Sequence, residues 1–264
     1  MIPKVIHYCW FGRGEKPAQA QKCIASWRKF LPDYEIWQWS EEELEASSDL
    51  NVNVNCLYDK LMGFDVDIIP YTQQAYEAKK YAFVSDYARF WILYKYGGLY
   101  FDTDVEIIKP MDDIIERGPF MGVEVAPKGN ELPKVAPGLG LGVTPNHDLY
   151  KDLLDKYATL KFKNADGSLN QKTIVSYNTE VLEKHGLKSV SDDIQEVAGV
   201  WIYPADYFNP IDSLTGKLKL TDNTRSIHWY MNSWSDSSPL RQWLSRMSHR
   251  LFGTKLHQLK EKLK

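Results

Sequence analysis

The stretch from Gln73 to Asp104 constrains the fold of this chain more than any other. Residues Gln73–Tyr96 contain no glycine or proline and place apolar residues at helical spacing, which predicts one long helix. Gly97-Gly98 follows where a helix end needs a left-handed residue, and Leu99–Phe101 is apolar enough for a short buried strand. Asp102 and Asp104 come directly after that strand. Such carboxylates lie where open α/β sheets bind ligands, at the carboxyl ends of the strands.

The flanking segments also alternate between strands and helices. We expect, in chain order, a strand at Lys4–Phe11, a helix from Pro17 that Pro32 ends, a strand at Tyr34–Trp39, a helix capped by Ser40 and Glu43, a strand at Val105–Ile108 and a helix over Thr144–Leu160. This alternation favours parallel strands joined by helices. Neither a repeat nor a low-complexity linker interrupts residues 1–240, so we expect them to form one domain.

Composition excludes several other classes of protein. The 9 Trp, 16 Tyr and 10 Phe argue against disorder, and 44% hydrophobic with 25% charged residues is typical of globular chains. The longest apolar run, Phe90–Tyr94, is far shorter than the roughly 20 residues that span a bilayer. The amino terminus has no apolar signal core. Cys9, Cys23 and Cys56 lack metal-ligand spacing, which favours free thiols and a cytoplasmic location.

Asp102 and Asp104 are the first candidates for chemistry. If the backbone is extended there, both side chains point to the same face and converge on one point. Paired carboxylates are typical ligands of Mg²⁺ or Mn²⁺, which leave coordination positions for water and substrate phosphates. An isolated Asp-x-Asp is more often a solvated turn. The preceding helix, Gly97-Gly98 and the apolar strand favour the site.

Asp86 and Arg89 are the second candidates. They are three residues apart on the expected long helix and therefore share one face. A surface ion pair of this kind contributes only about 0.3–0.5 kcal/mol. Because Ala82, Phe83 and Phe90 make the surroundings apolar, we expect partial burial. A buried Arg–Asp pair beside a sheet edge is suited to holding ribose or sugar hydroxyls, since Arg has five fixed donors.

Three blocks of sequence resemble a known family. Ala82–Arg89 contains Ser-Asp-x-x-Arg, Tyr96–Asp104 contains Gly-Gly and Asp-x-Asp, and Ile2–Gly12 is an apolar opening strand. Together they resemble family 32 glycosyltransferases, above all members that make bacterial capsular polysaccharide, and the catalytic domains of clostridial glucosylating toxins. The resemblance implies a GT-A fold, in which a mixed central sheet flanked by helices forms a Rossmann-like domain for a nucleotide-diphosphate sugar. It also implies a divalent metal, Mn²⁺ or Mg²⁺.

The resemblance also assigns roles to individual residues. Ile227–Trp234 is similar to a carboxyl-terminal segment of the family, although Trp229 stands where a second His is often found. The implied catalytic residues are Asp86, Arg89, Asp102 and Asp104, and the implied metal ligands are Asp102, Asp104 and His228. The implied donor-binding residues are His7, Trp10, Asp86, Arg89, Tyr100, Asp102, Ser233 and Trp234. Within this set Trp10 would stack on the base, and Ser233 and Trp234 would close over the diphosphate.

The residue pattern favours transfer of a sugar over hydrolysis. Glycosidases need two carboxylates about 5–10 Å apart across the sugar, which neighbouring aspartates cannot provide. We expect a metal-dependent glycosyltransferase that moves a hexose, with UDP as the favoured carrier, to a saccharide or lipid-linked oligosaccharide in bacterial surface polysaccharide synthesis. The resemblance implies retention; front-face substitution is favoured, and double displacement stays open. A toxin-like enzyme acting on protein and an inactive sugar-nucleotide-binding subunit are the alternative functions.

Two further segments carry weaker expectations. Gly138–Gly142 lacks the spacing of a dinucleotide-binding loop. The family resemblance implies that it is a loop on the acceptor side. Residues 241–264 carry seven basic residues against Glu261, a net charge of +6, which leaves −9 for the rest of the chain. Their apolar residues recur at helical spacing, so this tail either contacts the anionic inner leaflet of a membrane or packs on the domain. Nucleic acid is not an expected partner, because the body is acidic.

Overall fold

The structure is a computed structural model that describes residues 1–41, 57–127, 129–190, 193–212 and 215–231. The strands are β1 (Val5–Cys9), β2 (Glu35–Ser40), β3 (Lys60–Gly63), β4 (Gly98–Tyr100), β5 (Val105–Ile107), β6 (Phe120–Val125), β7 (Lys134–Val135), β8 (Leu141–Val143), β9 (Gln195–Val197), β10 (Val200–Tyr203) and β11 (Ser226–His228). The helices are α1 (Ala18–Phe30), α2 (Pro70–Glu77), α3 (Tyr81–Tyr96), α4 (Asp112–Arg117), α5 (Asp148–Ala158), α6 (Ile174–Lys184) and α7 (Ala205–Phe208).

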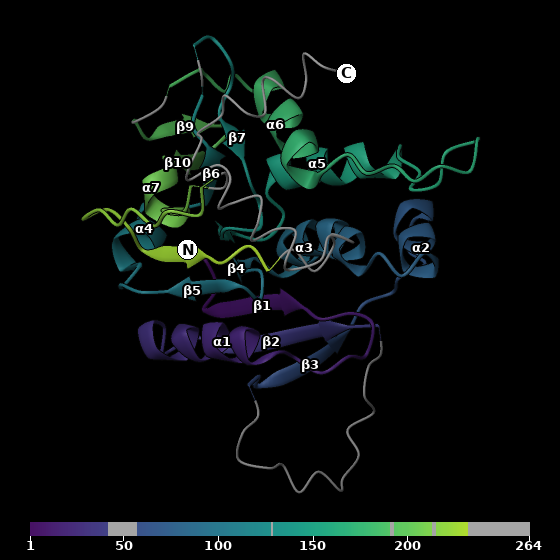
Figure 1. The fold of residues 1–264 in the computed structure, drawn as a ribbon, viewed down its shortest axis with the longest axis horizontal. Helices are drawn as coiled ribbons and strands as arrows, with labels where there is room; N and C mark the ends of the chain where they lie inside the picture. Colours follow the sequence, from purple (N-terminus) through teal and green to yellow (C-terminus); the bar gives the residue numbers. More distant parts are fainter. Residues whose placement is uncertain (42–56, 128, 191–192, 213–214, 232–264) are drawn as a thin grey trace, which may run out of the picture.

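A mixed sheet runs through the molecule (Figure 1) in the order β3-β2-β1-β4-β8-β6-β10-β9, with β7 paired to β6. Strands β3, β2, β1 and β4 are parallel. Strand β8 is antiparallel to both β4 and β6, so β6 runs in the same direction as β4 and β1. The carboxyl ends of β1, β4 and β6 therefore lie along one edge of the sheet. The expected α/β class with a mixed central sheet is confirmed.

Alternate residues of the strands feed two hydrophobic cores, one on each face of the sheet. Cys9, Tyr100 and Met121 pack in the core formed with α2, α3, α5 and α6. Their chain neighbours Tyr8, Leu99 and Phe120 pack in the other core, with residues of α1, α4 and α7. Both faces are thus covered by helices, which is why the strands carry apolar residues on both sides.

The helix expected over Gln73–Tyr96 is in fact two helices, α2 and α3. Lys79 has a φ of 57°. The N–H of Lys79 donates to Tyr76 O and that of Lys80 to Ala75 O, both at 2.9 Å, which is the Schellman arrangement that ends a helix. Lysine occupies the left-handed position that glycine normally takes, so composition gave no sign of the break. The end of α3 is as expected, with Gly97 at φ 64°.

Other boundaries differ by a few residues. Helix α5 begins at Asp148 instead of Thr144, because the Asn146 N–H donates to Tyr94 O at 2.7 Å and this ties the segment to the end of α3. Ser40 is the last residue of β2, and the helix expected after it falls on residues outside the described part of the chain. Glu43, Cys56 and the tail at 241–264 lie outside the described residues. None of the helices in the described ranges is long and apolar enough to cross a membrane.

Candidate active site

A cavity of about 780 Å³ lies along the edge where β1, β4 and β6 end. Its walls include Trp10 directly after β1, Asp102 and Asp104 after β4, and Glu124 near the end of β6. Ligand sites of α/β sheets are found at such carboxyl ends, because the connections there leave space above the strands. The fold thus collects at one opening side chains that are far apart in the sequence.

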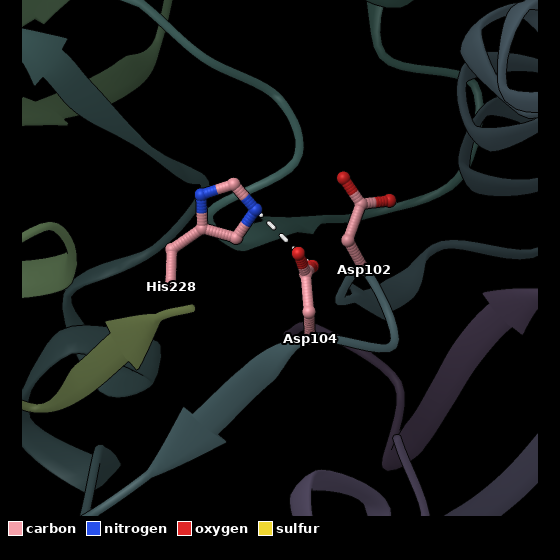
Figure 2. A group of neighbouring side chains, drawn as sticks. All are labelled: Asp102, Asp104 and His228. Atoms are coloured by element: carbon pink, nitrogen blue, oxygen red, sulfur yellow. Dashed lines mark ion pairs between the residues drawn. The ribbon is translucent and has the colours of Figure 1, made fainter. Parts of the chain in front are cut away.

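Asp102, Asp104 and His228 form a triangle in this cavity (Figure 2), and their ligand atoms all lie within 4.8 Å of one another. His228 arrives through the antiparallel pairing of β11 with β5, in which it lies opposite Val105. Its Nε2 is 3.1 Å from Asp104 Oδ1, and the Met231 N–H donates to Asp104 Oδ2 at 2.9 Å. The pairing of two short strands therefore completes the Asp-x-Asp motif with a third side chain.

The two aspartates do not converge through an extended backbone, as the sequence suggested. Residues 102–105 form a turn in which the Val105 N–H donates to Asp102 O at 3.0 Å. The turn is not the solvated one of the alternative interpretation, because Asp104 is only 8% exposed. The expected closeness is correct, although the turn and not the strand pleat brings it about.

Charge in the triangle is unevenly distributed. Burial alone would raise the pKa of Asp104, but His228 and the Met231 N–H together lower it. Burial raises the pKa of Asp102, and the neighbouring Asp104 adds to this while Arg89 opposes it. Burial would lower the pKa of His228, yet the two aspartates raise it. The buried Nδ1 of His228 has no hydrogen-bond partner among the described residues.

The donor set fits a divalent cation. Two carboxylates and an imidazole are ligands that Mn²⁺ accepts readily, and Mg²⁺ takes the carboxylates. A cation would also balance the two negative charges that now face each other across the triangle. Asp102, Asp104 and His228 are thus able to hold such an ion, and the cavity beside them leaves room for the remaining ligands.

Asp86 and Arg89 are buried together, which rules out the surface ion pair. The Arg89 side chain is 4% exposed, and its guanidinium donates to Asp86 Oδ1 at 3.1 Å and to Asp102 Oδ2 at 3.3 Å. Its Nε donates to Ser85 O at 3.1 Å. Burial raises the pKa of Asp86 to about 7, against the opposing effect of Arg89. Arg89 therefore joins α3 to the Asp-x-Asp turn and orients Asp102.

Tyr100 and Trp10 both lie at the cavity wall. The Tyr100 hydroxyl donates to Asp102 Oδ1 at 3.3 Å, and the Arg89 guanidinium lies 4.9 Å from the centre of its ring. Trp10 is partly exposed and anchored by its indole N–H, which donates to Gly14 O at 2.6 Å. Tyr100 thus helps to hold the Asp102 carboxylate through this hydrogen bond, while Trp10 presents an aromatic surface to the cavity.

The structure does not support His7 as a donor-binding residue. Its side chain is fully buried and is not part of the cavity wall. Nε2 lies 3.0 Å from Gly97 O, and Nδ1 accepts from the Trp39 indole at 3.1 Å. Burial lowers the pKa of His7 to about 3. Its place is between β1, β2 and the end of α3, where it joins these elements.

Gly138 was placed by the sequence only within a loop on the acceptor side, without a role of its own. A Cβ built on Gly138 would lie 2.2 Å from Asp102 Oδ2, and its carbonyl accepts from the Asp102 N–H at 3.2 Å. Leu141 and Gly142, at the end of the expected loop, lie in strand β8. Only the absence of a side chain at position 138 pointed to this close approach.

Glu124, also in the cavity wall, was not anticipated from the sequence. The one available signal was its place near the end of an apolar strand.

The remaining expected residues lie outside the described part of the chain. These are Ser233, Trp234 and the basic tail 241–264. Closure over a diphosphate and membrane contact stay predictions from the sequence. Flotation with anionic liposomes, with and without residues 241–264, tests the second; equal recovery of both forms would contradict it.

Comparison with known proteins agrees with this geometry. Residues 17–121 match the model for the glycosyltransferase sugar-binding region containing a DXD motif. Inositol phosphoceramide mannosyltransferase 1 of Schizosaccharomyces pombe is 30% identical over 131 residues, which are 48% of this chain and 36% of that protein. An uncharacterized glycosyltransferase of Acanthamoeba polyphaga mimivirus is 23% identical over 79% of this chain and 76% of its own.

The curated yeast relatives are longer, and the match spans only about a third of their length. Among solved structures, mouse xyloside xylosyltransferase 1 matches 88% of this chain and 99% of its own, with a TM-score of 0.51 and 12% identity. This likeness shows the fold, which is the expected GT-A fold. Residues 17–121 of this chain are thus similar in sequence to the glycosyltransferase sugar-binding regions that contain a DXD motif.

Proposed function

We propose that this protein is a metal-dependent glycosyltransferase that moves a hexose from a nucleoside diphosphate to a saccharide hydroxyl. The observation that supports this most is the Asp102–Asp104–His228 triangle inside a cavity that Trp10 also lines. A nucleotide sugar needs an aromatic surface for its base and a cationic centre for its diphosphate, and these two features lie in one opening. A divalent ion, when bound, supplies a Lewis acid that neutralises the charge developing on the departing diphosphate.

The residues of the chain divide the remaining work. Arg89 and Tyr100 hold the Asp102 carboxylate in place, so that it does not reorganise when the donor binds. Asp86 lies beside them at the cavity wall and is suited to accept a hydrogen bond from a hydroxyl of the donor sugar. In the front-face route that we favour, the anomeric carbon–oxygen bond breaks with its electron pair going to the diphosphate. The acceptor oxygen bonds to the same carbon, and its proton passes to the departing oxygen.

The finer assignments are also proposals. We favour Mn²⁺ as the ion, UDP as the carrier, retention at the anomeric carbon, and a saccharide or lipid-linked acceptor of bacterial surface polysaccharide. The two Schizosaccharomyces pombe relatives are named as mannosyltransferases, which makes GDP-mannose the second donor to test.

A thermal-shift panel with UDP and GDP, each with and without Mn²⁺, tests the proposal. A ligand at a hundredfold over its dissociation constant stabilises a protein by about 2.7 kcal/mol, so we expect a clear shift that needs both nucleotide and metal. Asp104→Asn should abolish the metal-dependent part, whereas Asp33→Asn, at an aspartate whose side chain is 77% exposed, should leave it intact. Absence of a shift with either nucleotide would refute the donor assignment. An unchanged metal dependence in Asp104→Asn would refute the metal site.

A further inference from the structure

Glu124 lies at the far end of the cavity from Trp10. The cavity follows the sheet edge from β1, past the Asp-x-Asp turn after β4, to Glu124 near the end of β6. The wall also includes Thr173, the residue that precedes α6. If the base lies on Trp10 and the diphosphate lies at the triangle, the donor fills the part between β1 and β4. The part beside β6 is then left for the second substrate.

The Glu124 carboxylate is held by a short chain of hydrogen bonds. Asn209 Nδ2 donates to the Tyr230 hydroxyl at 2.6 Å and to the backbone oxygen of Glu124 at 2.9 Å. With Asn209 as its donor, the Tyr230 hydroxyl in turn donates to the Glu124 side chain. The Tyr230 ring also packs against His228, with the ring centres 4.3 Å apart. The carboxylate is therefore fixed beside the triangle by a residue that contacts one of its members.

Tyr230 is placed there at a conformational cost. Its φ is +51°, a left-handed backbone that an aromatic residue rarely adopts. Such strain persists only where surrounding contacts over-determine the conformation, and it concentrates at functional sites. Here the contacts are those to Asn209, Glu124 and His228. The arrangement sets the direction of the Glu124 carboxylate and leaves it at the cavity wall.

On the basis of the proposed function, we infer that Glu124 is the residue that binds the attacking hydroxyl of the acceptor saccharide. A saccharide hydroxyl is a neutral donor, and an ionised carboxylate is an acceptor with about four lone-pair positions, of which Tyr230 takes one. Glu124 is not one of the residues whose ligand atoms form the compact metal group. It is therefore assigned to the second substrate and not to the ion. Accepting this hydrogen bond turns the oxygen lone pair toward the anomeric carbon. As the new carbon–oxygen bond forms, the proton of the hydroxyl passes to Glu124 instead of directly to the departing oxygen, and Glu124 later releases it to water.

The experiment uses water as the acceptor, since the oxygen of water can take the place of the acceptor hydroxyl when no saccharide is present. The probe is UDP-glucose with Mn²⁺, or GDP-mannose if GDP gives the thermal shift. In Glu124→Gln we expect the kcat of hydrolysis to fall about tenfold to hundredfold, the loss of one charged hydrogen bond. The KM for the donor and the metal-dependent thermal shift should not change.

Two further variants separate this role from a structural one. Tyr230→Phe keeps the ring against His228 but removes the hydrogen bond to Glu124, so a smaller fall in kcat is expected, again with unchanged KM. Glu196→Gln, at an exposed position on β9, should behave like the unmodified protein. Melting temperatures of all variants without ligand report on folding.

The outcomes distinguish this inference from the proposed function. Unchanged hydrolysis in Glu124→Gln overturns the inference. So does a rise in the donor KM together with a loss of the metal-dependent thermal shift. Either result leaves the glycosyltransferase proposal standing. An unmodified protein that binds neither nucleotide refutes the proposed function itself. Binding without any hydrolysis by the unmodified protein also counts against the inference, because an oriented carboxylate would activate water.

Discussion

Replacing Gly138 by alanine should disable the metal site without unfolding the protein. The added Cβ would lie 2.2 Å from Asp102 Oδ2, whereas ordinary contact begins at 3.4 Å, so the oxygen must move by about 1.2 Å, the difference between the two. The same Cβ would lie 3.4 Å from an Arg89 nitrogen, so the guanidinium limits movement on that side. Asp102 then loses one or both of its hydrogen bonds, from Arg89 and Tyr100, each now 3.3 Å long.

A misplacement of about 1 Å at a reacting centre costs on the order of a hundredfold in activity. We therefore expect metal-dependent nucleotide affinity to weaken by a similar factor, about 2.8 kcal/mol. Isothermal titration of Mn²⁺ and UDP, or GDP if that base is bound, measures the change. Glu196→Gln, at an exposed position on β9 outside the cavity wall, is the control. Normal affinity in Gly138→Ala, with the protein folded, would refute the idea that this glycine sets the position of Asp102.

Two further predictions concern stability. Arg89→Ala leaves Asp86 buried without its cation and should lower the free energy of unfolding by roughly 3–5 kcal/mol, measured by urea denaturation at neutral pH; a loss below 1 kcal/mol would contradict the buried pair. His7 stays neutral in the folded state because burial lowers its pKa to about 3, while the unfolded chain binds a proton below pH 6.5. The free energy of unfolding should thus keep its full value above pH 6.5. Below that pH it should fall by up to about 1.4 kcal/mol per pH unit toward pH 3. His7→Gln should remove this contribution, so identical slopes in both proteins would show that His7 is not the cause.

Local sequence patterns predicted most of the elements around the site. The apolar spacing of Ala20, Cys23, Ile24 and Trp27 gave α1, whose buried residues are these four. Gly97 was placed correctly as the end of α3. The pattern failed where a residue acted against its usual preference. Lys79 takes the left-handed position that ends α2, and only the packing of α2 and α3 on the sheet forces it to do so.

The candidate site was predictable to the extent that its residues are neighbours in the sequence. Asp102 and Asp104 are two residues apart, and Asp86 and Arg89 share one turn of a helix, so their closeness follows from backbone geometry. His228 was expected to join them from a resemblance alone. No local rule connects positions 104 and 228, because the pairing of β5 with β11 depends on how the whole chain folds.

The sequence by itself determined the type of chemistry, and the tertiary structure decided which side chains carry it out. Carboxylates after a buried strand, with an Arg–Asp pair on the preceding helix, indicated a candidate site for a metal ion and for sugar hydroxyls. Whether each side chain reaches that site depends on contacts between distant segments. His7 is turned into the core by Trp39 and Gly97, whereas Glu124 is brought to the cavity by the sheet order. Periodicity reports only a residue's own element, while burial and proximity are properties of the packed chain.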